Sequence, residues 1–399
     1  MKVSDGRAHP RARLLCLQAL LIVPVLLAGC ALQMGGMPTP TPTVAPLPTV
    51  TPRPSPTPGP YDATERGFDL IPASPDDYDS AQALQALQEI QAEGANYVTL
   101  TTTYNTDTLT SSVIHTGRYT ASDESLATAI TRAHLLGLQV NLTLYVDPLS
   151  GEWRANYNPQ SRDQWFAGYA AILNHLAMLA QQYDVHRLCI GVELISLTTA
   201  TSNPDNTAQW QSLIAGVRAR YNGLVMYAAN WGGSDFNAEY QHIAFWQSVD
   251  QVGIDAYYSL GSQIRPPVAQ LEQAWAKIHD TVLVPFARQI QKPIIFNEMG
   301  YRSIRGASVA PSDSRSVGIY DGCEQANDYY AFLDAWKGSG LLAGVYWWYW
   351  ETSTNVGGQG DTSFSPRFKP AQTILGTFWA GSDANADAEA GIIAQCAQQ

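Results

Sequence analysis

The chain has 399 residues, of which 35 are acidic and 23 are basic, so its formal net charge at pH 7 is −12. An excess of negative charge disfavours binding to nucleic acid or to anionic lipid surfaces, and we expect neither as a partner. Only 15% of the residues are charged, whereas the chain has 11 Trp and 20 Tyr, and such amphipathic rings favour stacking on sugar faces.

The first 29 residues have the parts of an export signal. Four basic residues precede a short apolar run at residues 14–27, and Leu27-Ala28-Gly29-Cys30 follows. The run is too short to span a membrane comfortably. The last four residues resemble a bacterial lipobox, which implies that residues 1–29 are removed and that Cys30 carries the lipid anchor. An ordinary cleaved signal peptide is the alternative, and either way we expect an exported protein, extracellular or held at the cell surface as a lipoprotein.

A spacer rich in proline and threonine follows the signal. Residues 37–60 hold ten of the 24 prolines, mostly alternating with Thr. Such alternation cannot form a core and favours the extended polyproline II conformation. We therefore interpret residues 30–60 as the anchor cysteine with its linker, and residues 61–399 as one folded domain, a length that is normal for an α/β barrel with insertions.

Apolar and β-branched runs alternate with helical patterns through the folded region. The expected strands lie at residues 67–71, 97–102, 139–145, 188–196, 225–230, 252–257, 293–299 and 344–350. The expected helices lie at residues 81–92, 126–136, 163–183, 207–221, 268–291 and 324–337, with helix-start signals at 202–204 and 234–235. This alternation predicts an α/β fold, a (β/α)8 TIM barrel. An open doubly wound sheet would need a glycine-rich nucleotide loop after the first strand, and none follows it.

Cysteine usage leaves one pairing open. Cys189 lies in an apolar run and is expected to be a small buried side chain. Cys323 and Cys396 could form a disulfide in an oxidising compartment, but the sequence does not decide this. No Cys or His spacing indicates a metal site, so we expect neither a metal nor a cofactor.

Two expected strands end alike in a lone glutamate. CIGVELISL contains Glu193, and PIIFNEMGY contains Glu298. Because the C-terminal ends of barrel strands line one site, both carboxylates should reach the same pocket. Cleavage of a glycosidic bond needs such a pair, one acid to protonate the leaving oxygen and one carboxylate to attack the anomeric carbon or to activate water. A single such Glu would be better explained as a buried, paired carboxylate, but two at strands four and seven favour catalysis.

Glu351 is the alternative nucleophile. It follows the aromatic run VYWWYW, which is the expected eighth strand. If Glu351 attacked, Glu298 would be the acid, because the dipeptide Asn297-Glu298 looks like the Asn-Glu pair that often carries an acid/base.

The order of motifs resembles the clan of retaining (β/α)8 glycosidases, and more narrowly glycoside hydrolase family 113, the β-mannanases. The stretches that carry the resemblance lie at roughly residues 121–375 and are, in chain order, TASDESLATAITRAHLLGLQVNLTLYVDP, GEWRANYNP, WFAGY, GVELIS, HIAFWQSVDQVGIDAYYSL, IIFNEMGYRS, YWWYW and SPRFKPAQTIL. The resemblance implies hydrolysis of a β-1,4-linked mannan-type polysaccharide or oligosaccharide by double displacement, with Glu193 as acid/base and Glu298 as nucleophile. The chain departs from the broader clan at Val192, where an Asn usually precedes the acid/base, and in its strand-two loop.

The same strand ends supply the expected sugar-binding groups. Rings that could stack on sugars and polar groups that could bond hydroxyls are Trp231, Tyr257, Tyr258, Trp348, Asp147 and Asn230. Arg154 could bond substrate, orient a carboxylate, or simply form a salt bridge at the barrel rim. Among the histidines, only His115 in the strand-two loop is a candidate cleft residue.

Two other functions compete with a β-mannanase. One is a catalytically silent sugar-binding lipoprotein, against which the presence of both glutamates counts. The other is an enzyme of the same clan that acts on a different β-glycan. In each case the expected partner is a β-linked polysaccharide or oligosaccharide, with membrane contact only through the lipid anchor and no obligate protein partner.

Overall fold

The computed structural model describes residues 65–199, 205–232, 238–380 and 386–396. The predicted signal peptide, Cys30, the Pro/Thr-rich linker and both helix-start signals lie outside the described residues. Among the helices of the described residues, none is long and apolar enough to cross a membrane.

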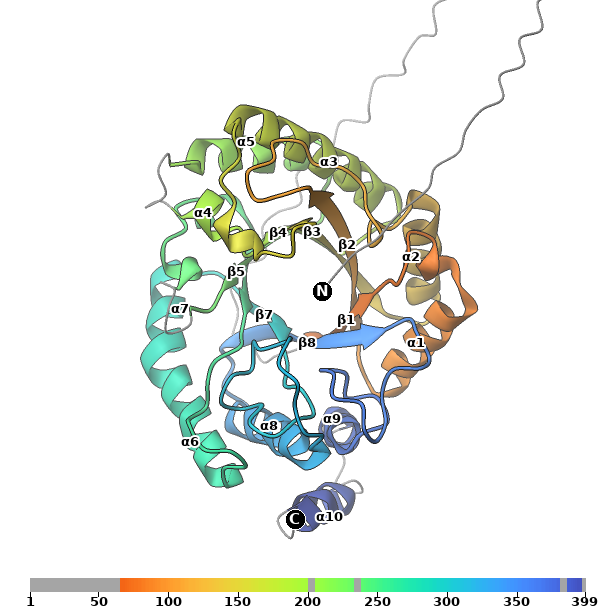
Figure 1. The fold of residues 1–399 in the computed structure, drawn as a ribbon, viewed down its shortest axis with the longest axis vertical. Coiled ribbons are helices and arrows are strands. Elements are labelled where there is room, and N and C mark those ends of the chain that lie inside the picture. Colours follow the sequence, from red (N-terminus) through yellow and green to blue (C-terminus); the bar gives the residue numbers. More distant parts are fainter. Residues whose placement is uncertain (1–64, 200–204, 233–237, 381–385, 397–399) are drawn as a thin grey trace, which may run out of the picture. The chain divides into compact units, whose positions relative to one another are not determined.

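Eight parallel strands close into a barrel, each paired with the next and the last with the first (Figure 1). The strands are β1 (Glu65–Ile71), β2 (Tyr97–Thr106), β3 (Gln139–Pro148), β4 (Arg187–Val192), β5 (Leu224–Asn230), β6 (Gln251–Asp255), β7 (Ile294–Met299) and β8 (Leu342–Glu351). The predicted (β/α)8 barrel is therefore confirmed.

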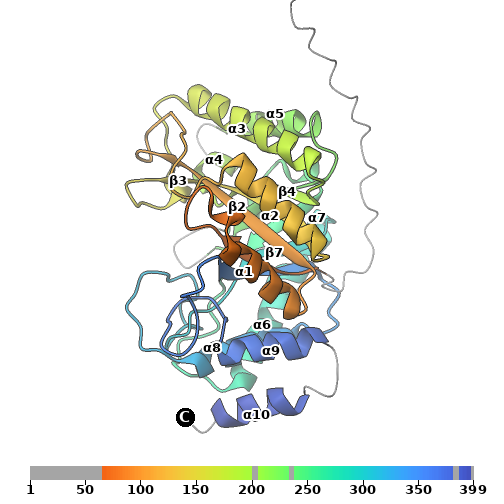
Figure 2. The same ribbon diagram turned by 90° about the vertical axis from the view of Figure 1, so that its right-hand side faces the viewer.

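Helices surround the barrel and connect its strands (Figure 1). They are α1 (Ala81–Ala92), α2 (Asp123–Leu135), α3 (Arg162–Gln182), α4 (Ile195–Thr198), α5 (Thr207–Arg218), α6 (Val268–Ile278), α7 (Val284–Ile290), α8 (Gly322–Ala335), α9 (Pro370–Ala380) and α10 (Ala386–Cys396). Seen from the side, α10 lies beside α9 at one edge of the barrel, and it contacts both α8 and α9 (Figure 2). Cys323 and Cys396 form a disulfide that joins α8 to α10, which answers the question that the sequence left open.

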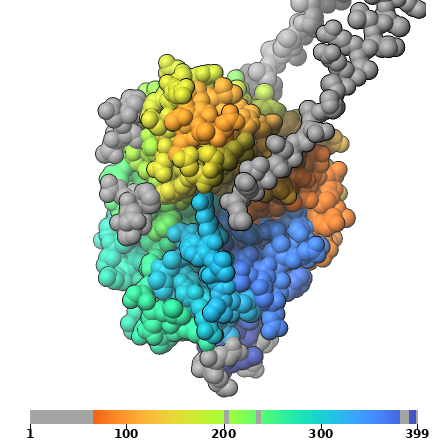
Figure 3. Space-filling view, viewed as in Figure 1, coloured from red at the N-terminus to blue at the C-terminus, as the bar shows by residue number. Residues whose placement is uncertain are grey.

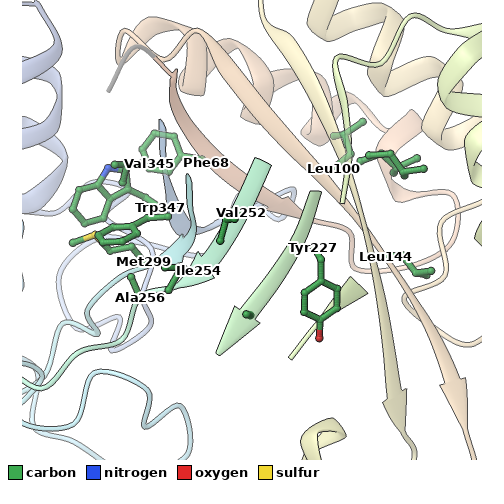
Figure 4. Packing of buried hydrophobic residues seen from close by; sticks show 14 of the residues in the cluster. Phe68, Leu100, Leu144, Tyr227, Val252, Ile254, Ala256, Met299, Val345 and Trp347 are labelled. Carbon is green, nitrogen blue, oxygen red and sulfur yellow. The ribbon is translucent and has the colours of Figure 1, made fainter. Parts of the chain in front are cut away.

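Strand alternation divides the apolar side chains between two layers. Because neighbouring residues of a strand point to opposite faces, one set faces the helices and the other fills the barrel. Leu100, Val252 and Trp347 belong to the large outer layer, part of which Figure 4 shows. Tyr145 and Tyr346 belong to the smaller inner layer. The inner layer leaves room for polar groups at both ends of the barrel.

Two element boundaries differ from the expected ones. The fourth strand ends at Val192 rather than at residue 196, because Glu193 takes the left-handed conformation with φ 50° and directs the chain into α4. The helix expected at residues 268–291 is divided into α6, a π-helical turn and α7. Pro285 lies in the first turn of α7 and has no N–H to continue a regular α-helical ladder, so the backbone widens there.

A buried polar cluster closes the base of the barrel, the end where the strands begin. Arg187 at the start of β4 is fully buried, and its Nη2 donates to Oε2 of Glu65 and to the Tyr346 hydroxyl, both at 2.6 Å. Its Nη1 donates to Oε1 of Gln251, also at 2.6 Å. The cation thus has close oxygen partners from three other strands, and the cluster ties β1, β4, β6 and β8 together.

Candidate active site

Glu193 lies at the C-terminal end of β4 and is held by neighbours on both of its carboxylate oxygens. Asn230, the last residue of β5, donates its side-chain amide to Oε1 at 2.7 Å. The indole N–H of Trp153 donates to Oε2 at 3.0 Å, and Nη1 of Arg154 lies 3.8 Å from the same oxygen. These contacts fix the carboxylate although it lies on a residue in a conformation that favours glycine.

Glu298 lies near the end of β7 and accepts two hydrogen bonds from tyrosine hydroxyls. Tyr145 of β3 donates to Oε1 at 2.6 Å, and Tyr257, just after β6, donates to Oε2 at 2.9 Å. Burial and the negative charge of Glu298 raise the pKa of both phenols well above its ordinary value. Both hydroxyls therefore stay protonated and act as donors, which fixes the position of the carboxylate.

Both carboxylates face one cleft of about 730 Å³ at the mouth of the barrel. Its lining is rich in aromatic and polar side chains, contributed by Asp147, Trp153, Arg154, Trp231, Tyr257, Trp348, Phe364 and residues 312–315. Such a cleft, with rings on its walls and a few convergent polar groups, suits a small ligand or a short length of polymer. Glu193 and Glu298 are both buried, so the cleft exposes only their reactive edges.

Burial and the neighbouring negative charge raise the pKa of Glu298. Burial first, and then the negative charge of Glu193, raise the pKa of Glu298 to about 7, while the Tyr145 and Tyr257 hydrogen bonds and the charge of Arg154 oppose the shift. Because a buried carboxylate beside a negative charge resists ionisation, Glu298 holds a proton to a higher pH than an exposed carboxyl would. A pair with one proton can supply a general acid and a carboxylate at the same time.

Asp147 and Arg154 form an ion pair on the wall of the cleft. Nε of Arg154 donates to Oδ1 of Asp147 at 2.7 Å, and Nη2 donates to Oδ2 at 3.3 Å. The guanidinium also lies over the ring of Tyr145, 4.8 Å from its centroid. Arg154 thus forms the rim salt bridge and approaches a carboxylate, which were two of the three roles considered for it.

The remaining candidate residues are divided between the cleft and its supports. Trp231 and Trp348 line the cleft as expected. Tyr257 lines it too, but its hydroxyl is engaged with Glu298, so the ring also positions a carboxylate. Asn230 does not line the cleft: it is fully buried and its amide is used by Glu193, so the expectation that it bonds substrate hydroxyls is wrong.

Tyr258 also lies away from the cleft, contrary to the expectation that it stacks on a sugar. Its ring is buried against Trp275, 6.1 Å between centroids, and it does not line the cleft. Strand β6 ends at Asp255, so the two adjacent tyrosines diverge and only Tyr257 turns to the mouth. Stacking of a sugar on Tyr258 is therefore excluded by its position.

Two alternatives raised by the sequence lie elsewhere. Glu351 does not line the cleft, and its carboxylate instead interacts with the Tyr349 side chain. His115 lies outside the cleft lining, where Nδ1 contacts the Thr116 carbonyl at 2.9 Å. Neither residue is placed to act on a substrate beside Glu298.

Sequence reasoning missed several groups that complete the site. Tyr145 and Trp153, which contact the two carboxylates, were not singled out, although Tyr145 closes an expected strand and Trp153 lies in a motif of the resemblance. Phe364 and residues 312–315, which come from long loops without a strand pattern, were also missed. In the part of the chain that the structure describes, no group of three or more His, Cys, Asp or Glu side chains could hold a metal ion.

Comparison with known proteins points to one family. The family model described as Glycoside Hydrolase Family 113 matches residues 71–365. No curated protein matches the sequence. A solved structure titled as the GH113 β-mannanase AaManA from Alicyclobacillus acidocaldarius in complex with ManMIm is 26% identical, with a TM-score of 0.68, over 80% of this chain and 98% of that one.

Two further solved structures show the same fold at lower identity. A GH113 β-1,4-mannanase complex is 22% identical with a TM-score of 0.68, and covers 79% of this chain and 98% of that one. A GH5_18 protein from Streptomyces cattleya in complex with GlcNAc is 16% identical with a TM-score of 0.52, over 80% and 81% of the two chains.

Proposed function

The chain belongs to glycoside hydrolase family 113, and from that premise we propose that it is a retaining β-mannanase acting on β-1,4-linked mannan-type polysaccharide or oligosaccharide. The observation that supports the proposal most directly is the cleft itself, where the carboxylates of Glu193, just after β4, and Glu298, near the end of β7, lie among aromatic rings and the charge of one raises the pKa of the other. The likeness to solved β-mannanases supports the choice of sugar.

The proposed reaction has two displacements. In the first, Glu298 attacks the anomeric carbon while Glu193 gives its proton to the departing glycosidic oxygen, so the carbon–oxygen bond to the leaving sugar breaks. In the second, Glu193 takes a proton from water, the water oxygen bonds to the anomeric carbon, and the Glu298 carboxylate leaves. Tyr145 and Tyr257 hold Glu298 in place, and Trp153 and Asn230 hold Glu193.

Product analysis tests both the sugar and the mechanism. The purified protein is incubated with mannan and with cello- and xylo-oligosaccharides, and the anomeric configuration of the new reducing ends is followed by NMR from the first minutes. We expect cleavage of the mannan-type substrate with β products. Initial α products would contradict the double displacement, and cleavage of another glycan alone would support an enzyme of the same clan with a different substrate.

A trapped intermediate tests the role of Glu298. A 2-deoxy-2-fluoro mannoside with a good leaving group should label the wild-type protein, and peptide mass spectrometry should locate the sugar on Glu298. Glu351→Gln is the matched control and should be labelled normally, because Glu351 does not line the cleft. Binding of the glycan panel without turnover or labelling would instead support a silent sugar-binding lipoprotein.

We also propose that the protein is exported and attached to a membrane through Cys30. The export signal and lipobox-like sequence support this, and the disulfide between Cys323 and Cys396 is of the kind that persists in oxidising compartments. Cys30→Ala should move the protein from the membrane fraction to the soluble fraction in a bacterial host that lipidates such signals. Unchanged membrane association of this variant would count against the anchor.

A further inference from the structure

Another buried glutamate lies behind Glu193, away from the cleft. Glu239 belongs to the short 3₁₀ helix Glu239–Gln241, which follows β5, and its side chain is fully buried. Its Oε1 accepts hydrogen bonds from the hydroxyls of Tyr227, at 2.7 Å, and of Thr198. Its Oε2 accepts the backbone N–H of Asn230 at 2.8 Å. A buried carboxylate without a cation is costly unless donors surround it, and here three donors do.

Two of these donors lead to Glu193. The Asn230 backbone is fixed by Glu239, and the Asn230 side chain donates to Oε1 of Glu193 at 2.7 Å. The Tyr227 hydroxyl donates a hydrogen bond to Glu239. The oxygen of the same hydroxyl accepts a hydrogen bond from the backbone N–H of Leu194 at 2.7 Å. Glu239 therefore reaches the side chain of Glu193 through one path and the backbone that follows it through another.

These hydrogen-bonded paths hold Glu193 in an unfavourable backbone conformation. With φ 50°, its backbone lies in the left-handed region, which costs roughly 1 kcal/mol or more for a residue with a side chain and persists only where neighbours impose it. Leu194, which the Tyr227 hydroxyl holds, is the next residue. Thr198, which also donates to Glu239, lies in α4 and so fixes the helix into which the chain turns.

Charge connects the two glutamates as well. Burial raises the pKa of Glu239 to about 7, the donors Thr198, Asn230 and Tyr227 oppose the shift, and the negative charge of Glu193 adds to it. The two carboxylates thus sense each other electrostatically, in addition to the hydrogen-bonded paths between them.

We propose that Glu239 is a positioning residue for proton transfer, holding Glu193 at the angle and height from which it protonates the leaving oxygen. This inference rests on the proposed function, because it assumes that Glu193 is the acid/base. Glu239 does not line the cleft, so it acts through Asn230 and Tyr227 rather than on the substrate. A misplaced acid still leaves the nucleophile intact, and this separates the proposal from a role in folding alone.

The test compares substrates that need a proton with substrates that do not. A mannooligosaccharide leaves as a sugar hydroxyl and needs protonation, whereas a dinitrophenolate departs without it. In Glu239→Gln, kcat/KM for the oligosaccharide should fall about 30- to 100-fold, a partial loss of the roughly 10²- to 10⁴-fold that general acid catalysis contributes. In the same variant, kcat/KM for a dinitrophenyl β-mannoside should stay within about threefold of the wild type. This kcat/KM reports only the first displacement.

Matched variants keep the result interpretable. Glu65→Gln changes another buried carboxylate, at the base of the barrel, and should leave the ratio of the two kcat/KM values unchanged. Should Glu239→Gln not fold, Tyr227→Phe removes the hydrogen bonds of this hydroxyl to Glu239 and to Leu194 but keeps the path through Asn230, so it should show a smaller loss of the same kind. Equal losses on both substrates, or no loss on either, would overturn the proposal. A wild-type protein that cleaves neither substrate would instead refute the proposed function.

Discussion

The pKa of a buried carboxylate is shifted in opposite directions at the two ends of the barrel interior. At the base, burial raises the pKa of Glu65, but the charge and hydrogen bond of Arg187 outweigh it and the pKa lies below its ordinary value. At the mouth, burial and the charge of Glu193 together raise the pKa of Glu298 to about 7. The charge of Arg154 opposes this rise, but Arg154 is already paired with Asp147.

This difference shows how one fold separates stability from reactivity. The base cancels its charges with a matched cation, so its carboxylate is fixed and inert. The mouth places two buried carboxylates near each other, so the pKa of Glu298 lies near neutral pH, in the range where reactive groups work. Substitutions at one end at a time test this difference, and removal of the nucleophile has the largest expected effect.

Removing the nucleophile should abolish turnover without unfolding the protein. In Glu298→Gln, both tyrosine contacts can persist, but an amide cannot form the glycosyl intermediate, so kcat/KM on mannooligosaccharide should fall about 10⁴-fold or more. Steady-state kinetics measures the loss, and circular dichroism checks the fold. A loss below about tenfold would show that another group attacks.

Removing the cation at the base should lower the stability of the protein and leave its turnover almost unchanged. Arg187→Met leaves Glu65 buried without its partner, and the free energy of unfolding should fall by about 3–5 kcal/mol. Urea denaturation measures the fall, and kcat of the folded fraction at 20 °C should stay within about twofold of the wild type. If kcat fell with stability in proportion, the two ends of the barrel would not be separable in function.

The raised pKa at the mouth should make the active site a source of instability above neutral pH. Because the folded-state pKa of Glu298, about 7, lies above its ordinary value of 4.5, the folded protein binds the extra proton between these values, and stability falls as pH rises through this window. Glu298→Gln removes the repulsion, so its Tm should exceed that of the wild type by about 2–6 °C at pH 8 and by less at pH 5. A Tm difference that does not change with pH would contradict this reading.

The smallest effect is expected at the rim. Arg315, in the loop after β7, donates Nη2 to the carbonyl of Gly151, in the loop after β3, at 3.0 Å. Three strands separate β3 from β7 in either direction around the barrel, so the contact spans the mouth, where the light-blue and yellow segments meet in Figure 3. Arg315→Ala should raise the ratio of activity on polymeric mannan to activity on mannotriose by about two- to fivefold.

The rim prediction has its own control. Arg118 is an exposed arginine that donates to the carbonyl of Ala73, away from the cleft lining, and Arg118→Ala should leave the ratio unchanged. An unchanged ratio in Arg315→Ala would mean that the contact across the mouth does not limit the access of the polymer to the cleft.

The sequence was sufficient to predict the barrel and the positions of both glutamates, because strand ends depend on short-range patterns of apolar residues. It could not predict which groups would contact the carboxylates. Whether Tyr257 or Tyr258 faces the mouth depends on the residue at which β6 ends, and strand periodicity locates that end only approximately.

Contacts made by loops were also beyond the sequence. The approach of Trp153 to Glu193 depends on the path of the loop after β3, and the pairing of Cys323 with Cys396 depends on how α10 lies against α8. The role of Glu239 was missed for a different reason, because it lies in a short 3₁₀ helix rather than at the end of an apolar strand.

The left-handed backbone of Glu193 has a practical consequence for protein engineering. Glycine, and to a lesser degree asparagine, adopts that conformation more easily than glutamate does, and either replacement would also remove one of two repelling charges. A library screened only for heat resistance would therefore be enriched in inactive variants at this position. Selection of variants of this protein for heat resistance should therefore include selection for turnover in the same round.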